Sequence, residues 1–399
     1  MSAPLTGVRV LAVEQYGAGP FGTQHLADLG ADVIKIENRK LGGDYARGLG
    51  PFFVEGAAGD DASLFFQSVN RGKRSLTLDL GHPEARAIFV RLVESADAVA
   101  NNLRGDVPEK LGLTYDDLKE HNPAVVCAHC SAYGRTGPRK DWPGYDFLMQ
   151  AEAGYFHMSG EPDTPPTRMG LSVVDFMAGT YMALGLVSAV LGARNTGIGQ
   201  DIDVNLYDTA LYNLSYLSTW ALNADYGPTR VARSAHASLA PCQLYRTGDG
   251  WVYIMCNKER FWATLCHEIG RDDLLDDARF TDFAQRLKHR DTLTSVLDEA
   301  LEQASTAHWL EKLRGKVPMA PICTPREALQ DPDLRERGRI SETVLKDGAR
   351  YDQLASPIET QAPPRTSACS PMGQDTVAIL SEVGYSPEDI EAFSKKGLI

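Results

Sequence analysis

Short apolar runs alternate with helix-type patterns along the N-terminal half of the chain. Apolar runs of strand length occur at 7–13, 31–37 and 98–100, and another follows Pro123. Between them, residues 23–29 and 83–94 carry the spacing of amphipathic helices. A strand, a helix and a second strand in this order favour neighbouring parallel strands. The pattern therefore predicts an α/β fold built on a parallel sheet.

The longest apolar stretch is 176–193, where every residue is uncharged, and Asp175 stands directly before it. Its length alone would allow a membrane span. It is rich in Ala, Gly, Ser and Thr, so we predict a buried core helix that other elements approach closely. Asp175 has two interpretations: a cap for the helix N-terminus, or a partly desolvated nucleophile. This stretch by itself favours the cap.

The composition changes near Gly227, and a length of 399 residues favours more than one domain. We predict a large domain that begins with residues 1–225 and a smaller α+β domain at 226–330. Residues 331–399 are predicted to be a linker and the return to the large domain, with a stretch rich in Pro and Ser at 351–373.

Charge and cysteine content narrow the class of protein. The net charge of −13 argues against nucleic acid or an anionic membrane as the main partner. The N-terminus has no signal-peptide pattern, and the seven scattered Cys indicate a reduced, cytoplasmic protein. Cys127 and Cys130 have half of a metal-site spacing, but the other half is missing, so no metal is expected.

Basic residues nevertheless recur near the ends of the predicted strands and helices. They are Arg39 and Lys40, then Arg71, Lys73 and Arg74, then Arg104 and Lys110. Their recurrence in an acidic protein favours a phosphate-rich ligand.

The first loop carries a pattern with a second interpretation. Gly17, Gly19 and Gly22 match the dinucleotide-binding spacing, and Glu37 follows at the position of a ribose-binding acid. Pro20 is unusual inside such a motif. A nicotinamide-dependent dehydrogenase is therefore retained as an alternative.

Several segments, taken together and in order, resemble the family III CoA transferases, the group of formyl-CoA and crotonobetaine/carnitine CoA transferases. The segments are 17–20, 30–37, 70–75, 102–105, 133–138, 197–200, 208–211 and 373–384, and the resemblance extends from about Leu5 to the C-terminus. It implies a Rossmann-like large domain, an inserted small domain and an interlocked homodimer.

The resemblance also implies a site and a reaction. Asp175 falls at the place of the family's nucleophile. The implied CoA pocket contains Arg39, Lys73, Asn102, Leu103, Arg104 and Lys110. CoA would move from an acyl-CoA donor, such as succinyl-CoA, to a carboxylic acid through an aspartyl-CoA thioester. CoA is then a substrate, and no permanently bound cofactor is needed.

Differences from the family pattern bear on specificity. Formyl-CoA transferases carry a Gln in the first loop, where this chain has Gly17. They also carry a run of glycines, and the corresponding segment 234–242 has none. The sequence therefore does not support formyl or oxalyl specificity. A dicarboxylic acid is the expected substrate, and Arg47, Arg135 or Arg168 is a candidate for its second carboxylate.

Two further alternatives concern the type of activity. Racemases of the same fold pair their Asp with the His of a Gly-His-Asp motif, and Tyr145 replaces that His here. A phenol is too weak a base for α-proton removal at neutral pH, so a racemase is a lesser alternative. A CoA-binding regulator is the non-enzymatic alternative if Asp175 is inert.

Overall fold

The computed structural model describes residues 2–363 and 365–399. The chain divides into two compact units. The larger unit comprises Met1–Ala153, Met169–Ser218 and Pro332–Ile399, and the smaller comprises Gly154–Arg168 and Thr219–Asp331.

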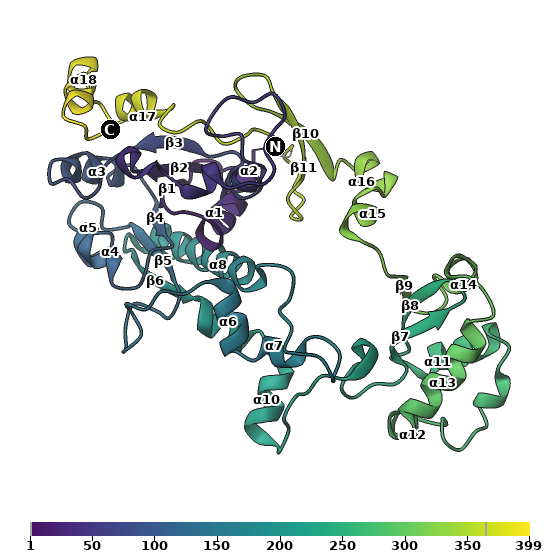
Figure 1. Cartoon of the computed structure of the whole chain (residues 1–399). Helices are drawn as coiled ribbons and strands as arrows, with labels where there is room; N and C mark the ends of the chain where they lie inside the picture. The colour runs from purple at the N-terminus through teal and green to yellow at the C-terminus, as the bar shows by residue number, and fades with distance from the viewer. Residues whose placement is uncertain (1, 364) are drawn as a thin grey trace. The chain divides into compact units, whose positions relative to one another are not determined.

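A six-stranded sheet forms the centre of the larger unit (Figure 1). Its strands are β1 (Arg9–Val13), β2 (Asp32–Glu37), β3 (Arg74–Thr77), β4 (Ala98–Asn101), β5 (Val126–Ser131) and β6 (Gln200–Asn205). The spatial order is β3-β2-β1-β4-β5-β6, and every neighbouring pair is parallel. All residues of β4 and β5 are buried, as expected for strands covered on both faces. The prediction of an α/β fold on a parallel sheet is confirmed.

Helices and short turns connect these strands. They are α1 (Ala18–Asp28), α2 (Leu64–Asn70), α3 (Ala85–Val93), α4 (Val107–Lys110), α5 (Tyr115–Leu118), α6 (Asp146–Glu152), α8 (Val173–Thr196) and α9 (Leu206–Tyr212), with 3₁₀ turns η1 (Arg39–Leu41) and η2 (Tyr45–Gly48). The C-terminal segment adds α16 (Pro332–Glu336), the antiparallel strands β10 (Ile340–Val344) and β11 (Arg350–Leu354), α17 (Thr376–Glu382) and α18 (Pro387–Lys395).

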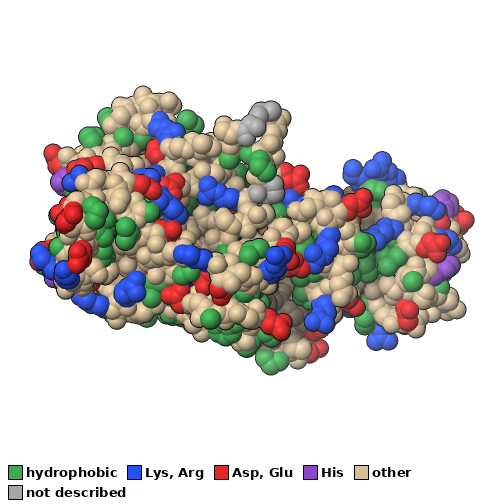
Figure 2. All heavy atoms as spheres, turned by 90° about the horizontal axis from the view of Figure 1, so that it is seen from above, with side chains coloured by type: hydrophobic (Ala, Val, Ile, Leu, Met, Phe, Trp, Pro, Cys, Tyr) green, Lys and Arg blue, Asp and Glu red, His purple; other side chains and the backbone are tan. Residues whose placement is uncertain are grey.

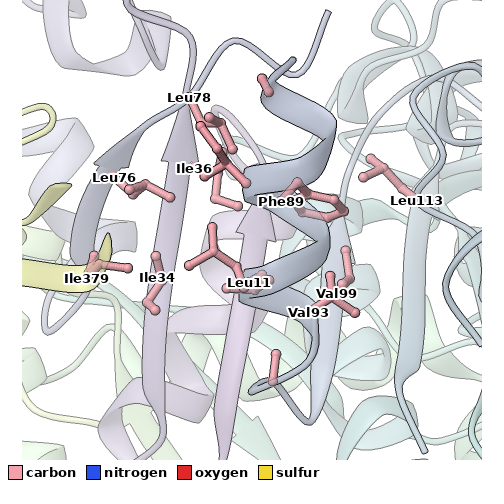
Figure 3. Close-up of a cluster of buried hydrophobic side chains, with 14 of the residues drawn as sticks. Leu11, Ile34, Ile36, Leu76, Leu78, Phe89, Val93, Val99, Leu113 and Ile379 are labelled. Atoms are coloured by element: carbon pink, nitrogen blue, oxygen red, sulfur yellow. The ribbon is translucent and has the colours of Figure 1, made fainter. Parts of the chain in front are cut away.

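A cluster of buried hydrophobic side chains lies between the sheet and α3 (Figure 3). Leu11, Ile34, Leu76 and Val99 extend from neighbouring strands toward Phe89 of α3. The same cluster includes side chains of the C-terminal helices: Ile379, Leu380 and Ile390. The end of the chain is therefore part of the core that supports the sheet.

Helix α8 packs against β5 and β6 of the sheet and against α1. The two helices approach so closely that a β-carbon at Gly22 would lie 2.5 Å from the carbonyl oxygen of Gly179. Among the described residues, α8 is the one helix that has the length and composition of a membrane span. One of its faces contributes buried Met182 and Leu186 to the unit, while Leu184 and Leu191 are exposed.

The smaller unit contains its own antiparallel sheet and core. Its strands are β7 (Cys242–Thr247), β8 (Gly250–Met255) and β9 (Met319–Pro321). Its helices are α7 (Tyr155–Met158), α11 (Glu259–Glu268), α12 (Phe283–Lys288), α13 (Arg290–Leu301), α14 (Thr306–Leu313) and α15 (Pro325–Leu329), with turns η3 (Ala232–Ser234) and η4 (Asp272–Leu274). Helix α10 (Tyr216–Asn223) contains the boundary between the units.

Acidic and basic side chains are interspersed across the face of the molecule that Figure 2 presents. Many charged side chains of the described residues form ion pairs, for example Arg74 with Asp32 and Glu382.

Candidate active site

A cavity of about 360 Å³ opens at the carboxyl ends of the central strands. Three segments that follow strands line it: Gln15–Ala18 after β1, Asn102–Arg104 after β4, and Cys130–Ala132 at the end of β5. Tyr45, Trp142, Tyr145 and Asp175 complete much of the wall. Ligands of parallel α/β sheets bind at this edge, because the connecting loops converge there.

Asp175 lies in the first turn of α8 and is 6% exposed. It faces the turn between β1 and α1, and a β-carbon at Gly17 would lie 2.6 Å from its Oδ2. No hydrogen-bond partner of its carboxylate is found among the described residues 2–363 and 365–399. The carboxylate is thus buried at the wall of the cavity and available for reaction.

The interpretation of Asp175 as a helix cap is wrong, because the carboxylate of Asp146 binds the N-terminal start of α8 instead. Oδ2 of Asp146 accepts hydrogen bonds from the backbone N–H groups of Val174 (2.6 Å) and Asp175 (3.0 Å). Ser172, at the cap position, contributes no side-chain bond. The free N–H groups of a helix start need a partner, and here that partner comes from α6.

Burial, and after it the negative charge of Asp146, raises the pKa of Asp175 to about 7. Burial and the charge of Asp175 likewise raise the pKa of the Tyr16 phenol. A carboxylate of such basicity is a better nucleophile than an exposed aspartate, yet it is still largely ionised above neutral pH.

Side chains clamp the turn that faces Asp175. Asn102 accepts a hydrogen bond from the Gln15 N–H (2.9 Å) and donates one to the Gln15 carbonyl (2.7 Å). Tyr16 has a left-handed backbone with φ of 69°, and its N–H donates to Asp44 at 3.1 Å. Its ring stacks on Tyr45 at 5.1 Å. A non-glycine residue in this conformation costs free energy, so these contacts are needed to maintain it.

The structure brings three of the expected CoA residues to the cavity and separates the others from it. Asn102, Leu103 and Arg104 line the wall. Arg104 is paired with Asp106, which also binds exposed Lys110. Arg39 is exposed after β2 and borders a small cavity of about 80 Å³ beside the C-terminal residues.

Lys73 does not line this wall; it is fully buried and its amine is surrounded by protein acceptors. The amine donates to Glu14 at 2.7 Å, to Asn70 at 2.9 Å and to the carbonyl of Pro20 at 2.8 Å. Burial lowers its pKa to about 8 despite the attraction of Glu14. These contacts join Lys73 to both ends of the turn opposite Asp175, so it supports that turn from beneath.

Sequence reasoning missed a second cavity of about 390 Å³ at the ends of β1, β2 and β3. Its wall includes Leu78–Gly81 after β3, and it shares Gln15, Tyr45 and Leu103 with the first cavity. The sequence did contain a signal for this cavity: residues 78–81 directly follow a predicted strand, so they lie at the same carboxyl edge of the sheet as the other ligand-binding loops.

The residues of the dinucleotide pattern have other roles. Gly22 allows the close crossing of α1 and α8. Glu37 is 3% exposed and binds Arg47 through two hydrogen bonds of 2.7 Å and Ser75 through one of 2.6 Å. Its carboxylate is thus committed to internal partners, with its pKa lowered to about 2 chiefly by Arg47 against the opposing effect of burial.

Two of the candidates for a second substrate carboxylate, Arg47 and Arg135, do not line the cavity. Arg47 is engaged by Glu37, and Arg135 forms ion pairs with Asp201 and Asp203. Arg168 belongs to the smaller unit.

Cys127 and Cys130 point to different sides of β5: Cys127 packs in the core, whereas Cys130 lines the cavity. The described residues contain no group of three or more His, Cys, Asp or Glu side chains arranged to hold a metal ion.

The model of CoA-transferase family III matches residues 5–376 of the chain. The chain belongs to this family. It is therefore a CoA-transferase, an enzyme that moves CoA from an acyl-CoA to a carboxylic acid. Relatives over most of the chain are named CoA-transferases, which favours this activity over the dehydrogenase, racemase and regulator alternatives.

Similarity to individual members extends over nearly the whole chain. The succinate–glutarate CoA-transferase of Agrobacterium fabrum is 33% identical over 95% of this chain and 96% of its own. The acetyl-CoA:oxalate CoA-transferase of Acetobacter aceti is 36% identical over 84% of this chain and 85% of its own. A CAIB/BAIF family protein from Brucella suis has a solved structure that matches with a TM-score of 0.81 and 32% identity, over 96% of this chain and 100% of that one.

Proposed function

We propose that this CoA-transferase works through a covalent intermediate on Asp175 and uses dicarboxylic acids. The observation that carries the proposal is the environment of Asp175. Its side chain is buried at the wall of the cavity and faces Gly17, and it does not cap α8 because Asp146 does so. A carboxylate in that state combines high nucleophilicity with limited access for water.

The proposed reaction has two symmetric halves. An Asp175 oxygen attacks the thioester carbonyl of the donor; the C–S bond breaks, CoA leaves as a thiolate, and a mixed anhydride remains. The thiolate then attacks the Asp175 carbonyl carbon, the C–O bond of the anhydride breaks, and the donor acid leaves as a carboxylate. The acceptor carboxylate repeats these steps in reverse, so no proton, electron or additional reactant is consumed.

The start of α1 supplies groups suited to stabilise the charge that develops in these steps. Gly17 caps α1 without a side-chain hydrogen bond. The N–H groups of Ala18 and Gly19 lie in the first turn, where a helix has no internal acceptors. We assign them to the oxyanion at the Asp175 carbonyl, because Gly17 adjoins that carboxylate.

The two adjoining cavities suggest how CoA binds. We place the nucleotide in the second cavity, the pantetheine arm past the shared residues Gln15, Tyr45 and Leu103, and the thioester at Asp175. The strand order 3-2-1-4-5-6 is that of Rossmann-like nucleotide-binding sheets, which supports this direction. Arg39, Arg104 and Lys110 are the proposed phosphate ligands, and Lys73 supports the Gly17 turn instead.

The choice of a dicarboxylic substrate rests on the names of the relatives, which act on succinate, glutarate or oxalate. Since Arg47 and Arg135 are engaged internally, we propose that phenol hydroxyls receive the distal carboxylate. Tyr16, Tyr45 and Tyr145 line the cavity and can each donate one hydrogen bond.

We further propose an interlocked homodimer in the cytoplasm, with a Rossmann-like large domain in each chain and no permanently bound cofactor, since CoA thioesters are substrates. Exposed Leu184 and Leu191 on the outer face of α8 support an interface between copies.

The decisive experiment is mass spectrometry of CoA esters after the protein is incubated with succinyl-CoA and a panel of free acids, with Asp175→Ala in parallel. A new acyl-CoA made by the wild type and absent with the variant is the expected result. Equal activity of the variant, or no transfer with any of several donors, would contradict the proposal.

A further inference from the structure

Two carboxylates meet at the start of α8, and only one of them lines the cavity. Asp146, the first residue of α6, is 4% exposed and does not contribute to the wall. Its Oδ2 binds the N–H groups of Val174 and Asp175, the first of them at 2.6 Å. Asp146 therefore holds the backbone N–H of Asp175, the same residue whose side chain is proposed to react.

Gln150 holds Asp146 in place. Its Nε2 donates to Asp146 Oδ1 at 2.6 Å and to the carbonyl of Leu171 at 2.9 Å, while its Oε1 accepts from the Met169 N–H at 3.1 Å. Gln150 is fully buried. One amide thus ties Asp146 to the segment that leads directly into α8, and the geometry of the first turn is specified by side chains of α6.

An aspartate in the first turn normally relieves the free N–H groups of its own helix. Since Asp146 already occupies two of them, Asp175 is released and faces Gly17 instead. We propose that Asp146 is a positioning residue of the transfer reaction, which holds the first turn of α8 so that Asp175 points at the reacting carbonyl. This inference rests on the proposed role of Asp175 as nucleophile.

Asp146 also acts through its charge. Among the described residues, the titratable groups whose pKa is raised by the charge of Asp175 are Tyr16, Tyr45 and Cys130. Burial raises the pKa of each of them, that of Cys130 to about 12, so they are neutral at pH 7. Asp146 is the negative charge that adds to burial in raising the pKa of Asp175. Without that charge, Asp175 would ionise at lower pH.

The test uses Asp146→Asn in the full-length protein, because Asn keeps an oxygen acceptor for the helix start while removing the charge. The titration of Asp175 is followed by NMR of carboxyl-labelled aspartate, with the signal assigned by its loss in Asp175→Asn. We expect the midpoint to fall by about one pH unit or more. The acid limb of the pH–rate profile for transfer should move by the same amount.

Asp146→Ala removes the acceptor as well as the charge. We expect its kcat to fall by about tenfold or more, with the KM for acyl-CoA changed by less than about threefold, because Asp146 does not line the cavity. The matched control is Asp282→Asn, which makes the same change at the start of α12, where Asp282 binds the Gln285 N–H at 2.8 Å. It should leave both the midpoint and kcat unchanged.

An unshifted Asp175 midpoint in Asp146→Asn would overturn the inference, and so would wild-type kcat in Asp146→Ala. The NMR titration needs no turnover and no substrate. Failure of the nucleophile assignment, seen as activity in Asp175→Ala, is therefore distinguishable from failure of the role given to Asp146.

Discussion

Gly17 faces the carboxylate of Asp175 although 158 positions separate them, and a β-carbon at Gly17 would require that carboxylate to move. A β-carbon at Gly17 would stand 2.6 Å from Asp175 Oδ2 and 3.3 Å from Cγ. The backbone of the first loop therefore forms the surface against which the carboxylate reacts.

Gly17→Ala is predicted to lower kcat by about a hundredfold, because the added methyl must displace the carboxylate by about an ångström. Gly17 has a negative φ of −107°, so the change brings little backbone strain. The measurement is steady-state transfer together with the thermal midpoint. Gly48→Ala is the control, since a β-carbon there meets nothing within 4 Å. Equal activities of the two variants would contradict the prediction.

The raised pKa of Asp175, about 7, predicts how stability depends on pH. The folded protein retains a proton that the unfolded chain loses near its ordinary pKa of 3.8, so folding stability falls as pH rises between these values. Asp175→Asn should raise the free energy of unfolding by about 2–4 kcal/mol at pH 8 and have little effect at pH 4. Urea denaturation at both pH values measures this, and an effect that is independent of pH would refute the assigned shift.

Asn102 is predicted to act on catalysis through the first loop. Asn102→Ala removes both bonds to the Gln15 backbone and should lower kcat by about tenfold, because the Tyr16–Gly17 turn loosens. Asn122→Ala is a matched control: Asn122 also bonds to backbone, at Val93 and Ala96, but away from the cavity. It should reduce the thermal midpoint and leave kcat intact. A loss of kcat in both variants would point to a general effect of destabilisation.

Lys73 and Lys110 should respond differently to removal of the amine. Lys73→Ala removes the nearest cation from the buried carboxylate of Glu14, which keeps only the Thr23 hydroxyl and the more distant Lys35, and should destabilise the fold by about 3–5 kcal/mol. Lys110 is 65% exposed, so Lys110→Ala should leave stability unchanged and raise the KM for acyl-CoA. Denaturant unfolding and transfer kinetics of both variants decide this. A stable Lys73→Ala with only a raised KM would restore Lys73 as a direct CoA ligand.

The outer face of α8 is predicted to lie in a subunit interface. Leu184→Glu places a charge on a residue that is 62% exposed in the single chain and should convert a species with the mass of two chains into monomers. Light scattering after gel filtration measures the mass. Val377→Glu, at a residue 60% exposed on α17, is the control and should not change it. A monomeric wild type would contradict the prediction directly.

The amino-acid sequence by itself determined the parallel sheet, because apolar runs of strand length separated by helical periods have few other ways to bury their side chains. It also determined the place of Asp175 at the head of α8. Resemblance in several ordered segments identified the family. Each of these features depends on a local pattern of residues or on several such patterns in a fixed order.

Only the tertiary structure decided which partner each polar side chain has. Asp146 binds the start of α8 from 28 residues away, Lys73 turns inward to Glu14, and Asn102 clamps Gln15. The same residue types could equally have faced solvent or ligand. Their roles depend on which backbone groups and charges folding brings within hydrogen-bond distance, and no local pattern contains that information.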